Sequence, residues 1–204
     1  MGAIGCAARH TALPPTGQFA FAESIYVPGI PDFGKVNDYL YRGAQPTLEG
    51  IDQLKKFDID TIVDLRSELH GLIANEREHA EALGIRFINL PGSGWATPKD
   101  EEIAQFLELV RAQPRRKVFL HCWLGGDRSG EFIAAYRIAF DAWTPEQAIQ
   151  EMRAFHYLEF WHRNMKHWVE HFPERLAQSQ VLAPFRQMTA KQPDSTRMRL
   201  PRSR

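Results

Sequence analysis

Residues 118–136 read Val-Phe-Leu-His-Cys-Trp-Leu-Gly-Gly-Asp-Arg-Ser-Gly-Glu-Phe-Ile-Ala-Ala-Tyr, and this stretch decides the fold. The apolar residues at its start predict a strand, the two glycines predict a tight loop, and the apolar pattern that follows predicts a helix over residues 129–141. A loop between a strand and the start of a helix points backbone N–H groups and the positive end of the helix dipole at one place. The sequence therefore predicts an oxyanion site in this loop.

Two side chains give the loop its chemistry, one at the strand end and one at the helix start. Cys122 can act as a nucleophile, because a helix N-terminus and a nearby cation favour the thiolate form. Arg128 can bind two phosphate oxygens, which explains a cation at a helix start, where the dipole disfavours it. A buried core cysteine and a surface arginine are the structural alternatives. Their occurrence in one loop favours the catalytic interpretation.

The remaining loop residues are expected to surround a bound phosphoryl group. Ser129 is expected to donate to the thiolate and to cap the helix, and His121 to orient the loop or to be a core histidine. Asp127 stands beside the bound dianion, so it either protonates the leaving oxygen or turns outward at the first turn of the helix. The phosphoryl-binding residues expected between these positions are Trp123, Leu124, Gly125 and Gly126.

The order His-Cys, five residues, Arg-Ser-Gly resembles the signature loop of the cysteine-dependent phosphatases, which include tyrosine phosphatases, dual-specificity phosphatases and tyrosine-phosphatase-like phytases. Residues 39–68, with Tyr-Arg-Gly-Ala-Gln-Pro and Val-Asp-Leu-Arg-Ser-Glu, are similar to the opening of bacterial dual-specificity-like phosphatases. The resemblance covers residues 39–172 and implies a three-layer α/β fold with a central, mostly parallel sheet flanked by helices. It also places Arg66 near the site as a substrate-binding residue. An ion pair of Arg66 with Asp64 or Glu68 is the alternative.

The chain departs from the family pattern at the general acid. In the phytase-like proteins an aspartate shortly before a Trp-Pro-x-Pro run supplies this acid. Here Trp95-Ala-Thr-Pro is preceded by Gly-Ser-Gly, and none of these three residues can donate the proton. Asp127 is the preferred acid because it lies inside the loop, and Asp100 or Glu101 is the alternative. A positioned acid contributes about 10²–10⁴-fold to such a reaction.

The resemblance implies a phosphomonoester hydrolase that forms a cysteinyl-phosphate intermediate and needs no metal or cofactor. The Trp-x-x-Pro loop favours an inositol polyphosphate, as in the phytases, and a phosphoprotein substrate of tyrosine or dual-specificity phosphatases is the alternative. A rhodanese-like sulfurtransferase, whose cysteine loop is one residue shorter, and a non-catalytic phosphate-binding module are more remote. His167 and His171 have the spacing i, i+4, but the scattered histidines are expected to be solvated rather than zinc ligands.

Strands and helices alternate along the chain, which is typical of a parallel sheet covered by helices. Besides the loop helix, helices are expected after Thr47, over residues 75–83, from Thr97 onward, over 145–155 after the cap Thr144, and over 159–172. Strands are expected at residues 38–42, 61–66, 85–90 and 117–122. Residues 1–32 are expected to form an extended arm, 33–176 the phosphatase domain and 177–204 a flexible basic tail.

Composition excludes several other classes of protein. The 204 residues include 25 basic and 25 acidic ones, so no overall positive field of the kind that marks nucleic-acid binders is expected. The two cysteines do not predict a disulfide framework, and no apolar run is long enough to span a membrane. We expect a cytoplasmic monomer. Residues 3–6, Ala-Ile-Gly-Cys, resemble the end of a bacterial lipoprotein signal, so the alternative is a periplasmic or lipid-anchored protein from which a leader ending at Cys6 was removed.

Overall fold

The structure is a computed structural model that describes residues 20–92 and 94–188, so Cys6 and the outer parts of the arm and tail lie outside the described residues. Six strands form one sheet in the order β1-β2-β3-β6-β4-β5. Strands β3, β6, β4 and β5 run parallel to one another. Strands β2 and β1 extend the sheet beyond β3, and each is antiparallel to its neighbour. The strands are β1 Glu23–Ser24, β2 Gly34–Lys35, β3 Leu40–Gly43, β4 Thr61–Asp64, β5 Arg86–Asn89 and β6 Val118–His121.

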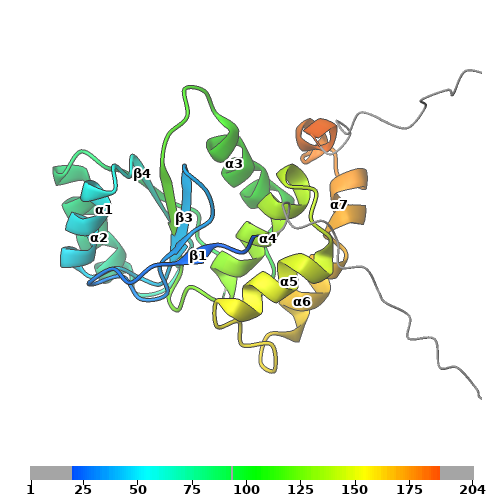
Figure 1. The fold of residues 1–204 in the computed structure, drawn as a ribbon, viewed down its shortest axis with the longest axis horizontal. Coiled ribbons are helices and arrows are strands. Elements are labelled where there is room, and N and C mark those ends of the chain that lie inside the picture. The colour runs from blue at the N-terminus through cyan, green and yellow to red at the C-terminus, as the bar shows by residue number, and fades with distance from the viewer. Residues whose placement is uncertain (1–19, 93, 189–204) are drawn as a thin grey trace, which may run out of the picture.

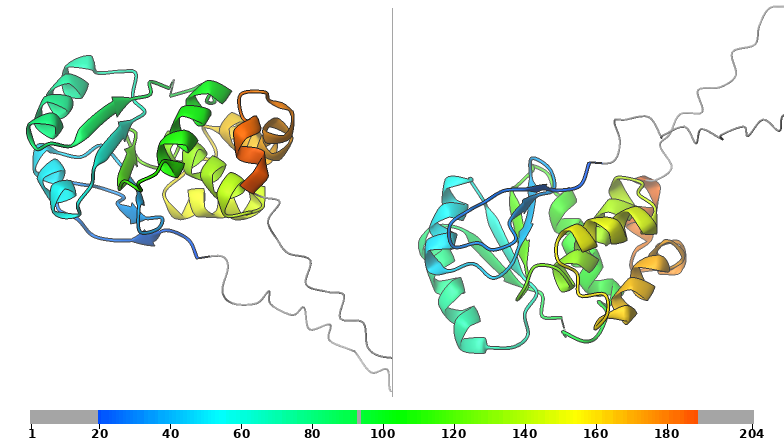
Figure 2. Two further views of the ribbon diagram at one scale, coloured as in Figure 1. Left: turned by 90° about the horizontal axis from the view of Figure 1, so that it is seen from above. Right: turned by 60° about the horizontal axis from the view of Figure 1, so that its bottom comes forward.

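Helices cover both faces of the sheet and make three layers, as the sequence predicts (Figure 1). Two helices, α1 and α2, lie on one face, and the helices from α3 onward gather on the other, which further views also show (Figure 2). The helices are α1 Leu48–Lys56, α2 His70–Ala82, α3 Asp100–Arg111, α4 Arg128–Phe140, α5 Pro145–Ala154, α6 Arg163–Glu170 and α7 Phe172–Gln178, followed by the 3₁₀-helix η1 Ala183–Met188. No described helix has the length and apolarity that crossing a membrane requires.

Helix α4 is the centre of the larger helical layer. Residues 128–139 of this helix are all buried, and it contacts β6, α3, α5, α6 and α7. A helix that is buried on every side is fixed in position by packing from all directions. The loop that precedes α4 therefore starts from a rigid strand and ends on a rigid helix.

The parallel strands bring four residues into one row at the carboxyl edge of the sheet. Gly43 is paired in register with His121, His121 with Asp64, and Asp64 with Asn89. In open parallel sheets ligands bind beyond this edge. Because β6 lies between β3 and β4, the residue after His121 emerges in the middle of that edge.

Helix capping agrees with the sequence at two helices and differs at a third. Thr47 accepts from the backbone N–H of Gly50 at the start of α1, and Thr144 and Gln147 form the predicted capping box of α5. The helix predicted to begin around Thr97 begins later, at Asp100, where Glu102 accepts from the backbone N–H of Lys99.

The helix predicted over residues 159–172 is wrong in its extent. Residues 155–162 form an irregular loop, α6 begins only at Arg163, and α7 follows it as a separate short helix. His156 has a φ of +61°, a conformation that ends α5. The Tyr157 hydroxyl accepts from the backbone N–H of Lys166 at 3.0 Å, so the loop is tied down to the start of α6.

The folded part extends past both boundaries expected for the phosphatase domain. Within residues 1–32, β1 joins the sheet and Ala22, Val27 and Ile30 are buried. Beyond residue 176, Leu182 and Phe185 are buried in the core of the larger helical layer. Burial of these apolar side chains holds both segments on the domain. The apolar residues in each segment are too few to form a pattern from which this burial could be predicted.

Candidate active site

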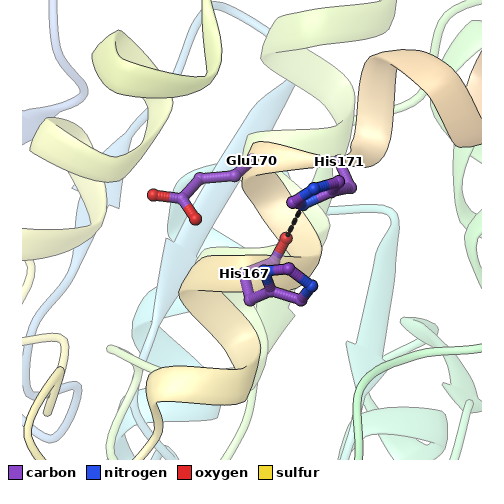
Figure 3. Close-up of side chains that lie close together, drawn as sticks. All are labelled: His167, Glu170 and His171. Carbon is purple, nitrogen blue, oxygen red and sulfur yellow. Dashed lines mark hydrogen bonds between the residues drawn. The ribbon is translucent and has the colours of Figure 1, made fainter.

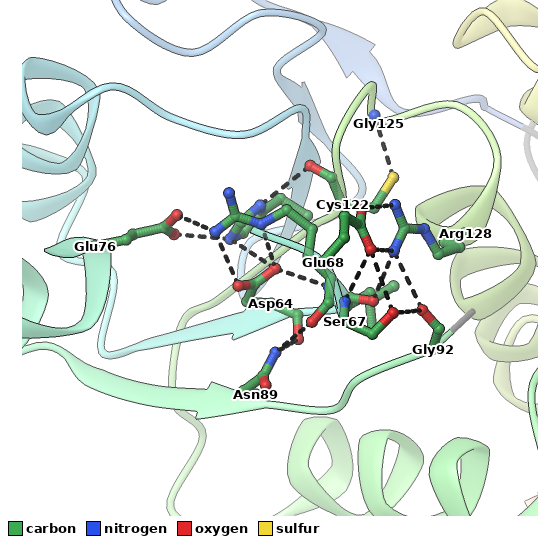
Figure 4. Close-up of polar contacts among 12 residues, drawn as sticks. Asp64, Ser67, Glu68, Glu76, Asn89, Gly92, Cys122, Gly125 and Arg128 are labelled. Atoms are coloured by element: carbon green, nitrogen blue, oxygen red, sulfur yellow. Dashed lines mark hydrogen bonds and ion pairs between the residues drawn. The ribbon is translucent and has the colours of Figure 1, made fainter. Parts of the chain in front are cut away.

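The cysteine loop has the geometry expected of an oxyanion site. Cys122 follows β6 directly, its side chain is buried, and the backbone N–H of Gly125 donates to its Sγ at 3.3 Å (Figure 4). Gly125 has a φ of +84°, and a Cβ at this position would lie 2.8 Å from the backbone N of Ala44. A side chain there would therefore push the loop away from the strand end. Gly126 is similarly confined, with a Cβ position 2.6 Å from the carbonyl oxygen of His156.

A buried arginine that the sequence analysis did not identify supports the loop from behind. Arg42 on β3 donates to the carbonyl oxygen of Gly125 at 2.7 Å, and its guanidinium carbon lies 4.2 Å from the centre of the Phe155 ring. Its side chain is fully buried. Since an inward carbonyl would repel a bound oxyanion, this hydrogen bond keeps the carbonyl of Gly125 turned to the rear of the loop.

Helix α4 begins at the loop, and its first turn faces the cysteine. Ser129 is fully buried there, and its hydroxyl has no hydrogen-bond partner among the described residues. The N-terminus of this 13-residue helix carries the positive end of the dipole and unpaired backbone N–H groups, which favour an anion. The arrangement leaves the Ser129 hydroxyl free for the bond to the thiolate that the sequence predicts.

Arg128 is held by a carboxylate that the sequence analysis considered only as a partner of Arg66. Both terminal nitrogens of Arg128 donate to Glu68, at 2.6 and 3.1 Å, and one of them also donates to the carbonyl oxygens of Leu65 and Gly92. This hydrogen-bonded pair lowers the pKa of Glu68 to about 2. The Nε–H of Arg128 has no partner among the described residues, so it remains available to a phosphoryl oxygen.

A pocket of about 200 Å³ opens over Cys122 and Arg128. Four of its lining residues are large, exposed and apolar, and these define what we call the apolar rim: Trp95, Trp123, Leu124 and Leu158. The other lining residues are Glu68, Gly94, Cys122, Asp127, Arg128 and His162. Among the described lining residues Arg128 carries the only permanent positive charge, so the pocket has one site for a doubly charged group.

Asp127 lies in the wall of this pocket, and the alternative acids do not. One of its carboxylate oxygens accepts from the backbone N–H of Leu158 at 2.9 Å, and the other lies 3.7 Å from Nε2 of His162. Asp100 instead forms an ion pair with Arg175, and neither it nor Glu101 lines the pocket. Asp127 and Glu68 are therefore the two carboxylates among the described lining residues, and Glu68 is the one that is paired with Arg128.

Arg66 does not reach the pocket, so the substrate contact expected for it is corrected. Its side chain is fully buried, and it pairs with Asp64 at 2.8 Å and with Glu76 at 2.5 Å (Figure 4). The alternative interpretation, an ion pair with Asp64, is the one that the structure contains. His121 belongs to the same buried cluster, with Nε2 2.8 Å from a carboxylate oxygen of Glu76. The cluster therefore adjoins the cysteine loop through His121 and does not line the pocket.

Two groups of side chains among the described residues come close enough to be considered for a metal ion. The first is the buried cluster of Asp64, Glu76 and His121, where the guanidinium of Arg66 already pairs with both carboxylates. The second is exposed on α6 and consists of His167, Glu170 and His171 (Figure 3). There Nδ1 of His171 donates to the His167 carbonyl oxygen, so this nitrogen already has a partner. Neither group lines the pocket.

A buried carboxyl group lies one turn into α4. Burial, with further contributions from Asp127 and Cys122, raises the pKa of Glu131 well above its ordinary value. One of its carboxyl oxygens has no partner among the described residues. Burial therefore disfavours the negatively charged form of Glu131 behind the anion site.

The fold is shared with solved structures of phosphatases, among them P. aeruginosa TpbA and the kinase associated phosphatase KAP. Residues 32–169 match the family described as "DSP-PTPase phosphatase fused to NAD+ Kinase", and the chain belongs to this family. It is 26% identical over 146 residues to the dual specificity protein phosphatase TpbA of Pseudomonas aeruginosa, which covers 72% of this chain and 62% of that protein. The chain thus spans less than two thirds of the length of this relative.

Solved structures share the fold at lower identity. The crystal structure of P. aeruginosa TpbA in complex with pTyr has a TM-score of 0.64 and 22% identity, covering 88% of this chain and 100% of that one. The core catalytic domain of the PP-IP phosphatase SIW14 from S. cerevisiae, solved with citrate, has a TM-score of 0.61 and 19% identity. It covers 77% of this chain and 98% of that one. Phosphatases that act on different substrates therefore share this fold, so the substrate has to be inferred from the residues that line the pocket.

Sequence reasoning missed three residues that line or support the site. His162 lies within the helix predicted over residues 159–172, and Leu158 lies just before it. Arg42 lies in a strand that was predicted from its alternation alone. A usable signal existed for Arg42, because a charged residue inside a strand that is buried on both faces needs a specific partner. No comparable signal marked His162, whose proximity to Asp127 comes from the packing of α6 on α4.

Proposed function

We propose that this chain is a phosphomonoester hydrolase that works through a cysteinyl-phosphate intermediate on Cys122 and uses no metal. The observation that carries the proposal is the placement of Cys122 and Arg128 in one pocket at the N-terminus of the buried helix α4. In this pocket the nucleophile, the backbone N–H groups of the loop and the guanidinium group can all contact the same phosphoryl group. A binding module would have no use for the thiol, which supports the enzymatic interpretation.

The proposed reaction has two steps. The thiolate of Cys122 attacks phosphorus, an S–P bond forms, and the bond from phosphorus to the leaving oxygen breaks while Asp127 supplies a proton to that oxygen. Water then attacks phosphorus, Asp127 takes up its proton, the S–P bond breaks and inorganic phosphate leaves. Arg128 and the loop amides bind the non-bridging oxygens in both steps, and Ser129 donates to the departing thiolate.

We further propose that the substrate carries a single phosphoryl group on an apolar or aromatic body, of the phosphotyrosyl kind. The apolar rim supports this choice, because Trp95, Trp123, Leu124 and Leu158 can pack against a ring or an apolar peptide segment. The structure of TpbA with pTyr provides a related protein that binds such a group. An inositol polyphosphate, favoured by the Trp-x-x-Pro loop, has less support because its other phosphates would meet the rim and Glu68 without a further cation among the lining residues.

The test is phosphate release from a phosphotyrosyl peptide, a phosphothreonyl peptide, inositol hexakisphosphate and 4-nitrophenyl phosphate, each with the wild type and Cys122→Ser. We expect the phosphotyrosyl peptide to have the highest kcat/KM and Cys122→Ser to lose turnover of every substrate while still binding vanadate. Turnover by Cys122→Ser near that of the wild type would refute the covalent mechanism. A higher kcat/KM for inositol hexakisphosphate would refute the substrate proposal and leave the mechanism in place.

A further inference from the structure

Three side chains that can bind a metal ion lie close together at the end of α6, outside the active-site pocket (Figure 3). They are His167, Glu170 and His171, and one possible ligand atom from each lies within 4.8 Å of the other two. The residues stand at positions i, i+3 and i+4, a spacing that makes side chains neighbours on a helix surface. All three residues are exposed, so an ion can reach them from solvent.

A hydrogen bond determines which ring nitrogen of His171 can bind a metal ion. Nδ1 of His171 donates to the backbone carbonyl oxygen of His167 at 2.9 Å. Because a carbonyl oxygen only accepts, Nδ1 carries the hydrogen and the lone pair of the neutral ring lies on Nε2. Metal-binding histidines usually donate their second ring nitrogen in this way, which orients the ring and makes the other nitrogen more basic. Nε2 of His171 therefore has the protonation state that a metal ligand needs.

The ring of His167 and the carboxylate of Glu170 are also free to bind an ion. Neither ring nitrogen of His167 has a hydrogen-bond partner among the described residues. The nearest cation to Glu170 in an ion pair is Lys166, whose Nζ lies 3.9 Å from the carboxylate. Lys166 donates instead to Glu159 at 2.9 Å, and this hydrogen bond engages its ammonium group. The carboxylate of Glu170 therefore has no close counter-charge to displace.

The backbone of α6 holds the three side chains at fixed positions. The buried side of this helix packs in the core through Met165, Trp168 and Val169. His171 ends α6 and directly precedes α7, so both helices fix its backbone. Two ligands on a tetrahedral Zn²⁺ ion lie about 3.3 Å apart, so rotation of exposed side chains is enough to close the site. These contacts, which the spacing of two histidines does not show, are the reason to revise the expectation of solvated side chains.

We propose that His167, Glu170 and His171 form a site for a divalent transition-metal ion such as Zn²⁺. Two imidazoles and a carboxylate suit Zn²⁺, Ni²⁺ and Cu²⁺, whereas Mg²⁺ and Ca²⁺ prefer oxygen ligands alone. Three protein ligands leave a coordination position for water. His167 and Glu170 also line a hollow of about 470 Å³, through which water reaches this position. The bound ion joins the last turn of α6 to the residue that precedes α7.

The metal site goes beyond the proposed phosphatase function and takes no part in it. None of its three residues is among the described residues that line the pocket over Cys122. The expected effect of the ion is on stability, because an ion that binds only the folded helix favours the folded state. Phosphate release after treatment with EDTA should therefore equal that of the untreated protein.

Isothermal titration calorimetry of the EDTA-treated and desalted protein with Zn²⁺ tests the site. The ligand variants are His167→Ala, His171→Ala and Glu170→Gln, each at an exposed position. His70→Ala changes an exposed histidine outside the cluster and is the matched control. Cys122→Ser removes the active-site thiol, so it separates Zn²⁺ bound there from Zn²⁺ bound on α6.

We expect one Zn²⁺ site that persists in Cys122→Ser and in His70→Ala. Loss of a group that only orients a ligand costs about 10–100-fold in metal affinity, so each ligand variant should raise the dissociation constant at least about tenfold. Mg²⁺ should not compete with Zn²⁺ for the site. Zn²⁺ should also raise the melting temperature of the wild type and leave that of His167→Ala unchanged.

Three results would overturn the proposal. If Cys122→Ser shows no saturable binding of Zn²⁺, α6 carries no metal site. If both histidine variants keep the dissociation constant of the wild type, the ion binds elsewhere on the chain. If Glu170→Gln alone keeps it, the carboxylate is not a ligand and the three-residue site is wrong.

Discussion

Arg66 and Arg128 each follow the end of a parallel strand, yet the two side chains have different surroundings. Arg66 is fully buried and pairs with two carboxylates, those of Asp64 and Glu76. Arg128 pairs with one carboxylate, Glu68, whose side chain is 40% exposed, and keeps its Nε–H free beside the pocket. In this comparison the number and burial of the counter-charges, rather than the position after a strand, decide whether the arginine is wholly paired in the core or keeps an N–H free beside the pocket.

The largest effect that this comparison predicts is on stability. Arg66→Met should lower the free energy of unfolding by about 3–5 kcal/mol, because it leaves two buried carboxylates without their cation. Urea denaturation measures the loss, and Arg153→Met, which removes an exposed pair with Glu159, is the control with an expected loss below about 1 kcal/mol. Equal losses in the two variants would contradict the distinction drawn between buried and exposed pairs.

Arg128→Lys should change activity and leave stability nearly unchanged. An ammonium group cannot bind Glu68 end-on and a phosphoryl oxygen through a second N–H at the same time, so kcat should fall about 10²–10³-fold. Steady-state kinetics with 4-nitrophenyl phosphate measures this loss, and thermal melting should show a midpoint within a few degrees of the wild type. A variant that keeps most of its kcat would place the phosphate clamp elsewhere.

Glu68→Gln should have a smaller effect because the amide keeps the shape and one acceptor of the carboxylate. Displacement of a positioning group by 1 Å can cost about 10²-fold, so partial loss of the hold on Arg128 should lower kcat/KM about tenfold. The expected loss is in the same direction for every substrate, because Arg128 meets the phosphoryl group common to all. An increase in kcat/KM would show that Glu68 competes with phosphate instead of orienting Arg128.

The smallest predicted effect is the pH dependence of the pair between Glu68 and Arg128. Hydrogen bonding to Arg128 lowers the pKa of Glu68 to about 2 in the folded state, from an ordinary value of 4.5. The stabilisation is therefore complete above about pH 4.5 and is lost as the pH falls toward 2. Melting temperatures of wild type and Glu68→Gln should differ slightly at pH 7 and converge below pH 4.5, and added salt should reduce the difference. A constant difference across this range would mean that the carboxylate does not stabilise the fold through its charge.

Much of the scaffold could be predicted from sequence because its signals are local. The strand, loop and helix around Cys122 follow from apolar runs and two glycines, and the caps Thr47 and Thr144 from single hydroxyl side chains. These features depend on neighbours within a few residues, which a linear pattern contains. The alternation of these elements also predicts the layered fold.

The parts that were missed depend on partners brought together by tertiary packing. Arg66 is turned inward by Glu76, which is ten residues further on and lies on a helix, and Glu68 is thereby left to Arg128. His162 meets Asp127 only because residues 155–162 leave the helical pattern where His156 adopts a positive φ. When several possible counter-charges lie near a charged side chain, the sequence does not show which of them it pairs with, because the pairing depends on burial in the folded structure.

The complete burial of α4 has a consequence for how this chain could acquire new substrates. The helix ties the reactive loop to the core, whereas the apolar rim stands on exposed loop residues whose replacement disturbs little packing. Substitutions at Trp95, Trp123, Leu124 or Leu158 are therefore expected to leave the position of the cysteine loop unchanged. Under the proposed function, replacement of a few exposed side chains would change which substrate binds, while the buried helix keeps the cysteine loop in position.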